Sequence, residues 1–345
     1  MSTHHGVLSH QNLLKLLSGI TAGGMELYAP RKTGQKVFFD HITDVREIAF
    51  DPLPTTESPK ALLFPRVERL LSFARDGESM RVDDRCADLM PRRVLFGTRP
   101  CDAVALQRLA EFFADGIEDM FVGKRREQLV VISLSCAVAD ADCFCTSAGS
   151  GPGDGTGSDI LLTASGGERY DMEVLTDRGR EVLATFAGLW DEGSPADTSG
   201  YLAVVEPLPA LAGFGAKLAG AFASTVWKDA SLRCLGCGAC AYVCPLCSCF
   251  DIEDEGTPSK GSRLRCWDSC GFSLFTLHTS GHNPRPTQTE RWRQRVMHKF
   301  SYMPARFGHA GCVGCGRCSR ACPADMNLRE QITMLDAGIA LQSAP

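Results

Sequence analysis

The sequence predicts an α/β or α+β domain over residues 1–200, a linker or helix at 201–225, and a mainly α-helical domain over 226–345. Strand-like and helix-like segments alternate in the first part, whereas strand signals are almost absent from the last part. Twelve of the seventeen cysteines lie between Cys234 and Cys322. A chain of 345 residues is also long enough to form two hydrophobic cores.

The spacing of the apolar residues predicts the individual elements in order. Helices are predicted at 10–20, 103–114 and 177–190, and residues 62–73 are predicted to pass from a strand end into a helix. Strands are predicted at 36–42, 45–50, 93–98 and 129–135, with a hairpin formed by 160–165 and 170–176. In the last part, helical segments are predicted at 269–278 and 290–303. A sheet should therefore form the core of the first part only.

One cysteine motif occurs twice in the last part, as CLGCGACAYVCP at 234–245 and as CVGCGRCSRACP at 312–323. Its spacing, C-x2-C-x2-C-x3-C-P, is the bacterial ferredoxin pattern for a [4Fe–4S] cluster. Three thiolates from one tight, glycine-containing loop hold three corners of the cluster, and the fourth cysteine ligates the other cluster. The pattern predicts one cluster on Cys234, Cys237, Cys240 and Cys322, and another on Cys312, Cys315, Cys318 and Cys244.

Zinc is the main alternative for each motif, because paired C-x2-C units also suit a tetrahedral zinc ion. Zinc needs only two such pairs, however, and explains neither the third cysteine nor the trailing proline. Disulfides are disfavoured because the chain is large and its N-terminal segment has no secretory-signal pattern. The sequence therefore predicts two [4Fe–4S] clusters in a ferredoxin-type domain with a long insertion between its motifs.

Four cysteines of the first part form a candidate third ligand set. Cys101 and Cys136 each follow a predicted buried strand, and ligands in open α/β sheets gather beyond the carboxyl ends of the strands. Cys101 also stands at a predicted helix start, where backbone N–H groups favour a thiolate. Cys143 and Cys145 lie in a short loop nearby. The four thiols match the ligand number of a third [4Fe–4S] cluster, with ordinary buried cysteines as the alternative.

Five cysteines are left without a metal assignment. Four of them form C-x-C and C-x3-C pairs that suit zinc, a further cluster or buried structural thiols: Cys247, Cys249, Cys266 and Cys270. Cys86 stands alone and is interpreted as structural.

Two other segments attract functional interpretations. The glycine-rich stretch at 149–157 lacks the context of a phosphate-binding loop, so we interpret it as a flexible loop. A predicted helix carries four basic residues: Arg291, Arg293, Arg295 and Lys299. We interpret them as a solvated helix face, and the alternatives are docking of an acidic partner and compensation of cluster charge.

The overall composition excludes several classes of protein. The net charge is −5, from 36 Lys and Arg against 41 Asp and Glu. This balance, without basic runs interleaved with aromatic residues, argues against a nucleic-acid enzyme. No segment has the ~20 consecutive apolar residues that would cross a bilayer. We therefore expect a cytoplasmic protein that is not itself inserted in a membrane.

A series of motifs occurs in a characteristic order: RPCDAVAL, DCFCTSAGSGP, CLGCGACAYVCPLCSCFDIED, RCWDSC, GHNPRP, RQRVMHKF and CVGCGRCSRACP. With them, the chain from about residue 92 to 327 resembles the iron–sulfur β subunits of cytosolic nickel–iron hydrogenases (sulfhydrogenases). It also resembles the A subunits of anaerobic sulfite reductases and related subunits of heterodisulfide-reductase-linked complexes. The resemblance implies that the family has cysteines at the positions of Cys101, Cys136, Cys143 and Cys145. Cys247, Cys249 and Cys270 also fit the cysteine pattern of the family, whereas Cys266 does not.

The same resemblance implies an electron-transfer subunit of an anaerobic oxidoreductase complex. Such a subunit relays electrons between a flavin- and NAD(P)-binding partner and a catalytic partner, and we identify no catalytic residues in this chain. The alternative is a reductase subunit whose N-terminal cluster acts directly on a disulfide or a sulfite-like substrate. A substrate-binding cluster would have an open or labile coordination position, whereas a relay cluster would be closed.

Overall fold

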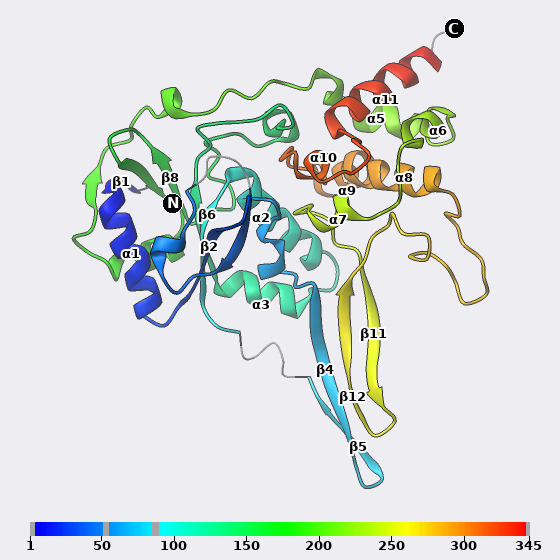
Figure 1. The fold of residues 1–345 in the computed structure, drawn as a ribbon, viewed down its shortest axis with the longest axis horizontal. Coiled ribbons are helices and arrows are strands. Elements are labelled where there is room, and N and C mark those ends of the chain that lie inside the picture. Colours follow the sequence, from blue (N-terminus) through cyan, green and yellow to red (C-terminus); the bar gives the residue numbers. More distant parts are fainter. Residues whose placement is uncertain (1–3, 51–54, 85–89, 343–345) are drawn as a thin grey trace.

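The computed structural model describes residues 4–50, 55–84 and 90–342. Figure 1 shows a body built around a mixed β-sheet, a group of helices packed against that body, and a narrow β-sheet arm that projects away from both. None of the helices in the described part of the chain is long and apolar enough to cross a membrane. Cys86 lies outside the described residues.

An eight-stranded sheet forms the core of the body, in the order β10-β1-β9-β8-β7-β6-β2-β3. Its strands are β1 (His4–Ser9), β2 (Glu26–Thr33), β3 (Lys36–His41), β6 (Arg93–Thr98), β7 (Leu129–Leu134), β8 (Ile160–Ala164), β9 (Arg169–Val174) and β10 (Asp191–Gly193). The four central strands β2, β6, β7 and β8 pair in parallel, and the outer pairs are antiparallel. The predicted buried strands β6 and β7 and the predicted β8–β9 hairpin are confirmed.

Helices cover both faces of this sheet, because the central strands bury side chains on both sides. The helices of the body are α1 (His10–Ala22), α2 (Pro100–Ala114), α3 (Met120–Gln128) and α4 (Asp177–Ala184). Val94 and Phe96 of β6 face the core shared with α1 and α4. Leu95 faces the opposite core, which it shares with α2 and α3. That second core also contains Val313 and Cys315, so the second cysteine motif packs on the same side of the sheet as α2.

Helices form most of the remaining C-terminal structure. They are α5 (Phe214–Gly220), α6 (Val226–Ser231), α7 (Ala239–Tyr242), α8 (Gln288–Met297), α9 (Met303–Phe307), α10 (Arg317–Arg320) and α11 (Leu328–Gln342), with a π-helical segment at His298–Tyr302. Thr287 and Glu290 form a capping box that starts α8. Helix α8 overlaps the helix that the sequence predicts at 290–303. Trp227, Trp292 and Ile332 are buried in the core that joins α6, α8 and α11.

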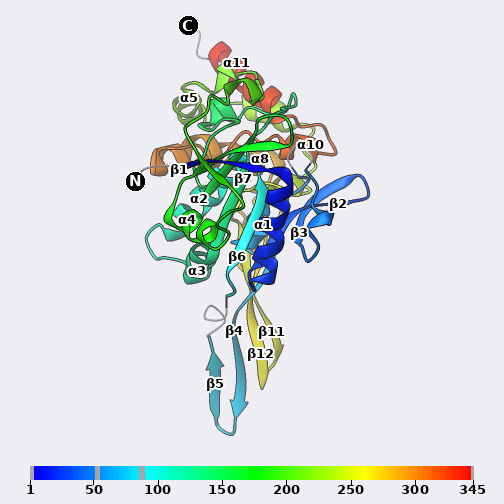
Figure 2. The same cartoon turned by 90° about the vertical axis from the view of Figure 1, so that its left-hand side faces the viewer.

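The projecting arm is a four-stranded antiparallel sheet in the order β11-β12-β4-β5 (Figures 1 and 2). Its strands are β4 (Val67–Asp76), β5 (Ser79–Asp83), β11 (Phe250–Thr257) and β12 (Lys260–Trp267). Every residue of β5 and β11 is exposed, so both faces of the distal arm contact solvent. At its base, Arg265 is buried and forms ion pairs with Glu68 and with Asp119, the N-cap residue of α3.

Three local predictions are wrong. Residues 67–73 continue as strand β4 instead of a helix, because β12 pairs with them from almost 200 residues away in sequence. Residues 45–50 contain a short 3-10 helix, Val45–Glu47, whose first turn is capped by the Asp44 carboxylate. Residues 269–278 form turns and bends: Leu274 and Leu277 are exposed, so this segment has no core against which a helix would pack.

The structure has mixed α/β content, and the prediction of a mainly helical C-terminal domain missed the β11–β12 hairpin between the two cysteine motifs. Strand β11 alternates apolar and acidic residues only from Phe250 to Glu253 and continues with Asp254, Glu255 and Gly256, so its strand signal is short. The predicted helix at 177–190 forms, but it ends at Ala184.

Candidate metal centres

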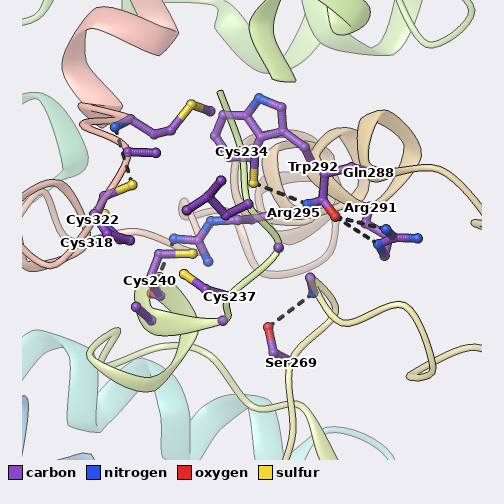
Figure 3. A pocket seen from close by; sticks show the side chains of 18 of the residues that line it. Cys234, Cys237, Cys240, Ser269, Gln288, Arg291, Trp292, Arg295, Cys318 and Cys322 are labelled. Atoms are coloured by element: carbon purple, nitrogen blue, oxygen red, sulfur yellow. Dashed lines mark hydrogen bonds between the residues drawn. The ribbon is translucent and has the colours of Figure 1, made fainter. Parts of the chain in front are cut away.

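The first cysteine motif forms a loop at the surface of the helical part. Gly236 and Gly238 have φ values of 67° and 75°, a left-handed conformation that lets the loop turn tightly between its cysteines. Figure 3 shows Cys234, Cys237 and Cys240 around a pocket, together with Cys318 and Cys322 from the second motif. We call this cavity the first-site pocket. It brings together the four thiols predicted to hold the first cluster.

The second motif repeats this local geometry deeper in the molecule. Gly314 and Gly316 have φ values of 63° and 72°, and α10 then begins at Arg317, as α7 begins one residue after Gly238. Burial raises the pKa of Cys312 to about 11 and that of Cys318 to about 12, and the nearby Cys244 sulfur contributes to both shifts. Cys244, the last cysteine of the first motif, thus lies beside the second set of thiols.

Two basic residues predicted to lie on a solvated helix face are instead buried among these thiols. Lys299 is 5% exposed, and its Nζ lies 3.2 Å from Cys244 Sγ and 3.0 Å from the Gly311 carbonyl oxygen. Arg295 is 7% exposed and donates to Cys247 Sγ over 3.7 Å. Arg291 is also buried, whereas Arg293 is partly exposed above the Phe222 ring. The solvated-face interpretation is therefore wrong for three of the four residues.

The donor set and its charges fit an anionic iron–sulfur group. Among the described residues, no carboxylate forms an ion pair with Arg295 or Lys299. Burial by itself lowers the pKa of Lys299, but the Cys244 and Cys247 sulfurs outweigh it and raise that pKa. A buried cation requires a compensating anion, and here the thiol sites are the nearest source of one.

Hydrogen bonds to sulfur surround both sites. In the first-site pocket the Gln288 amide Nε2 donates to Cys234 Sγ over 3.2 Å, as drawn in Figure 3. Backbone N–H groups also donate to three other ligand sulfurs, from Met326 to Cys322 (3.3 Å), from Leu246 to Cys244 (3.4 Å) and from Gly314 to Cys312 (3.4 Å). Such bonds stabilise thiolate charge and tune the reduction potential of a bound cluster.

The four N-terminal cysteines also converge. Cys101 lies in the first turn of α2, directly after β6, and Cys136 follows β7, so both stand at the carboxyl ends of parallel strands. Together with Cys143 and Cys145 they line one pocket, the N-terminal pocket, which Gly314 and Cys315 complete from the second motif. Burial raises the pKa of Cys136 to about 12 and that of Cys143 to about 11. The glycine-rich stretch 149–157 contributes Gly151 and Pro152 to the same wall.

A buried ion pair joins the N-terminal pocket to the second motif. Arg317 binds the Asp102 carboxylate with both terminal nitrogens, at 2.6 and 2.8 Å, and each side chain is 1% exposed. Asp102 follows Cys101, and Arg317 lies between Cys315 and Cys318. The bidentate geometry therefore fixes the position of α2 relative to the second cysteine loop.

Gly314 makes a close backbone contact between these two parts. Its carbonyl oxygen accepts a hydrogen bond from the Phe144 N–H over 2.8 Å. A Cβ at position 314 would lie 2.5 Å from both the Cys145 nitrogen and the Phe144 carbonyl carbon, and the residue has positive φ. Only glycine fits here without displacing the loop that carries Cys143 and Cys145.

Replacing Gly314 by alanine should therefore destabilise the protein in two ways. The left-handed backbone costs about 1–2 kcal/mol for a residue with a Cβ, and the steric overlap adds about 1–3 kcal/mol. Gly34→Ala is the matched control, because Gly34 has a similar φ of 61° with nothing within 4 Å of its Cβ position. Urea unfolding of anaerobically purified protein measures both variants, and equal losses would contradict the packing argument.

The unassigned cysteines fall into two groups. Cys247, Cys249 and Cys270 lie near Lys299, whereas Cys266 is on β12 opposite Asp251 and away from the other thiols. In the part of the chain that the structure describes, no three His, Cys, Asp or Glu side chains are arranged to hold a single metal ion.

Sequence reasoning missed Lys60, which is 2% exposed and comes from a distant segment. Its Nζ donates to the Cys247 carbonyl oxygen over 2.8 Å and lies 3.6 Å from the centre of the Trp267 ring. An isolated lysine gives no periodic or motif signal that would have revealed this contact.

Comparison with known proteins agrees with the geometry of the cysteine motifs. Residues 233–326 match the family model described as a 4Fe-4S dicluster domain, so the C-terminal part contains a domain of the class that binds two [4Fe–4S] clusters. The chain is similar to sulfhydrogenase 2 subunit beta of Pyrococcus furiosus, with 29% identity over 319 residues. The similarity covers 90% of this chain and 91% of that subunit. No solved structure matches the chain.

These findings confirm the resemblance to a hydrogenase β subunit that the ordered motifs predict. They also indicate an iron–sulfur protein of the electron-transfer type.

Proposed function

We propose that this chain is the electron-transfer iron–sulfur subunit of an oxidoreductase complex. In this proposal it relays electrons between a flavin- and NAD(P)-binding subunit and a catalytic subunit of the hydrogenase or sulfite-reductase type. Similarity to a sulfhydrogenase β subunit along nearly the full length of both chains supports a role within a multi-subunit assembly. When bound, the clusters would supply one-electron redox chemistry.

The observation that carries the proposal is the position of the second cysteine motif between two thiol-lined pockets. Cys318 and Cys322 line the first-site pocket, and Cys315 lines the N-terminal pocket. The three sets of thiols therefore form one continuous series through the protein. A series of neighbouring redox sites suits a relay better than it suits a single catalytic centre.

We assign the ligands according to this series. The first cluster would take Cys234, Cys237, Cys240 and Cys322, and the second would take Cys312, Cys315, Cys318 and Cys244. A third [4Fe–4S] cluster would take the thiols of the N-terminal pocket: Cys101, Cys136, Cys143 and Cys145. Lys299 and Arg295 would offset the negative charge of the first two sites, since they are buried between them.

The surface beside the first-site pocket would receive one redox partner. Cys237 is exposed, and Leu232 and Leu235 expose more than 70% of their surface on either side of Cys234. Exposed apolar residues around a redox site provide a contact area through which a partner can approach closely.

Iron analysis of a Cys136→Ser variant tests the third site. Wild-type protein purified anaerobically should contain about twelve irons per chain, and the variant about eight, because each cubane holds four. The control is Cys266→Ser, which removes a thiol outside all three sets and should keep the wild-type iron content.

An iron content that is the same in wild type and Cys136→Ser would exclude the N-terminal cluster. In that case the relay would be confined to the dicluster domain, and the four N-terminal cysteines would be structural.

A further inference from the structure

Strand β11 leaves one edge of the arm sheet open. It pairs with β12 on one side, and in the part of the chain that the structure describes no strand pairs with it on the other. All eight of its residues are exposed, and Figure 1 shows it at the margin of the arm, away from the body. An open edge presents backbone N–H and C=O groups that are not paired within the sheet. The edge can therefore accept a further strand.

An acidic stripe runs along one face of β11. It consists of Asp251, Glu253 and Glu255, which lie opposite uncharged residues of β12. Among the described residues, no basic side chain forms an ion pair with these three carboxylates, whereas Asp254 on the other face is paired with Arg263. The acidic stripe therefore carries three negative charges that the described part of the chain does not pair.

The opposite face of the arm is largely apolar. On β11 it begins with Phe250 and Ile252, which expose 38% and 42% of their surface. The strand registers place Leu71 and Phe73 of β4 and Val82 of β5 on the same face. A strand added beside β11 would therefore meet acidic side chains on one face and apolar side chains on the other.

We propose that β11 binds an extended, basic segment of a partner subunit, which adds a fifth strand to the arm sheet. This inference rests on the multi-subunit assembly of the proposed function. Lysine or arginine side chains of the segment pair with the acidic stripe, and its alternate apolar side chains pack beside Phe250 and Ile252. Backbone hydrogen bonds to the open edge contribute affinity, and the alternating side chains select the partner.

A second copy of this chain does not fit the same edge. Residues that lie opposite each other in an antiparallel pair point to the same face of a sheet. Two symmetric β11 strands would therefore bring their acidic stripes together, and like charges directly opposite destabilise the pairing of strands. The same charges attract a basic segment, and salt should weaken that attraction.

The experiment compares amide hydrogen exchange in the isolated full-length chain and in its complex. The complex is purified anaerobically, through a tag on this chain, from the cells that naturally make it. A carbodiimide, which joins carboxylates to lysine amines in direct contact, is then applied to the complex, and the cross-linked peptides are identified by mass spectrometry. Strand β5, at the other edge of the same sheet, is the internal reference for the exchange measurement.

A triple variant, Asp251→Asn with Glu253→Gln and Glu255→Gln, removes the charges of the acidic stripe. The matched control, Asp76→Asn with Glu78→Gln, removes two carboxylates from the β4–β5 hairpin of the same arm. Both variants replace exposed side chains by amides of the same shape, so urea unfolding of the isolated chains should be close to that of the wild type.

The proposal expects the β11 amides to exchange at least about tenfold more slowly in the complex, with the β5 amides unchanged. Any carbodiimide products of the acidic stripe should join it to a lysine of another subunit. The triple variant should bind that subunit about tenfold more weakly, and the control variant as tightly as the wild type.

Equal exchange of β11 in the two preparations would overturn the proposal, as would cross-links between copies of this chain or a chain that purifies without another subunit. A triple variant that binds as tightly as the wild type would also contradict it. The relay function is tested separately, by iron content and redox titration. A complex that leaves β11 uncovered would overturn the docking and not the relay, and missing clusters would do the reverse.

Discussion

Replacing Asp102 by alanine is expected to lower the free energy of unfolding by about 3–5 kcal/mol, because it leaves the Arg317 guanidinium buried without its counter-charge. Both side chains of the pair are 1% exposed, so water cannot replace the carboxylate. The remaining partners of Arg317, the carbonyl and hydroxyl oxygens of Thr55 at 2.8 and 3.1 Å, are neutral. Asp102→Ala should also disturb the arrangement of the thiol sites, because the Asp102–Arg317 pair positions Cys101 against Cys315.

Asp254→Ala is the matched control for this loss. Asp254 forms an ion pair of 2.8 Å with Arg263 on the exposed arm, where each side chain is about half exposed. Exposed pairs contribute little to stability because solvent screens both charges, so Asp254→Ala should change the free energy of unfolding far less than Asp102→Ala. Urea unfolding under anaerobic conditions measures both variants.

The double variant Asp102→Leu with Arg317→Met tests the electrostatic cause. Replacing both members of a buried pair by apolar residues is often close to neutral, so this variant should recover much of the stability that Asp102→Ala loses. If Asp102→Ala cost no more than Asp254→Ala, or if the double variant were the less stable of the two, a buried uncompensated charge would not be the explanation.

Replacing Lys299 by methionine should lower the reduction potential of the cluster proposed on Cys244, Cys312, Cys315 and Cys318. The Lys299 ammonium lies 3.2 Å from Cys244 Sγ and favours the added electron. A unit charge about 5 Å from that electron contributes about 3 kcal/mol at an effective dielectric constant of about 20. For a one-electron couple this corresponds to a shift on the order of 100 mV. A redox titration followed by EPR measures it.

Arg293→Met is the control for this measurement, because Arg293 lies on α8, just before the π-helical segment that carries Lys299, but is partly exposed over Phe222. Its removal should shift the potential little, since solvent screens its charge. The Lys299 effect should also be constant between pH 6 and 9, because the raised pKa keeps the ammonium charged throughout that range. A comparable shift in both variants would mean that net charge, rather than the buried contact, sets the potential.

Local patterns predicted much of the candidate site. The cysteine spacing depends on residues within one loop, and the glycines at 236, 238, 314 and 316 adopt the left-handed turns that such a loop requires. The buried strands β6 and β7 could also be predicted from the sequence, because each is a continuous apolar run. Their carboxyl ends then explained why Cys101 and Cys136 lie on one pocket.

Contacts between distant segments were not predictable from these patterns. Strand β4 has apolar residues that suit a helix as well as a strand, and only β12, contributed by the insertion, decides between them. Arg295 and Lys299 are charged residues that are buried beside thiols from two other segments. Lys60 reaches the same region from a further segment. Sequence periodicity contains no information on such pairings.

The central claim is that this chain carries redox-active iron–sulfur clusters in a connected series. The most direct test measures iron, acid-labile sulfide and zinc in the anaerobically purified full-length chain, with EPR after dithionite reduction. The account predicts about twelve irons with equal sulfide, or about eight if only the dicluster domain is loaded. It also predicts EPR signals of reduced [4Fe–4S] clusters that interact magnetically. Zinc in place of iron, or iron that dithionite does not reduce, would contradict the electron-transfer function.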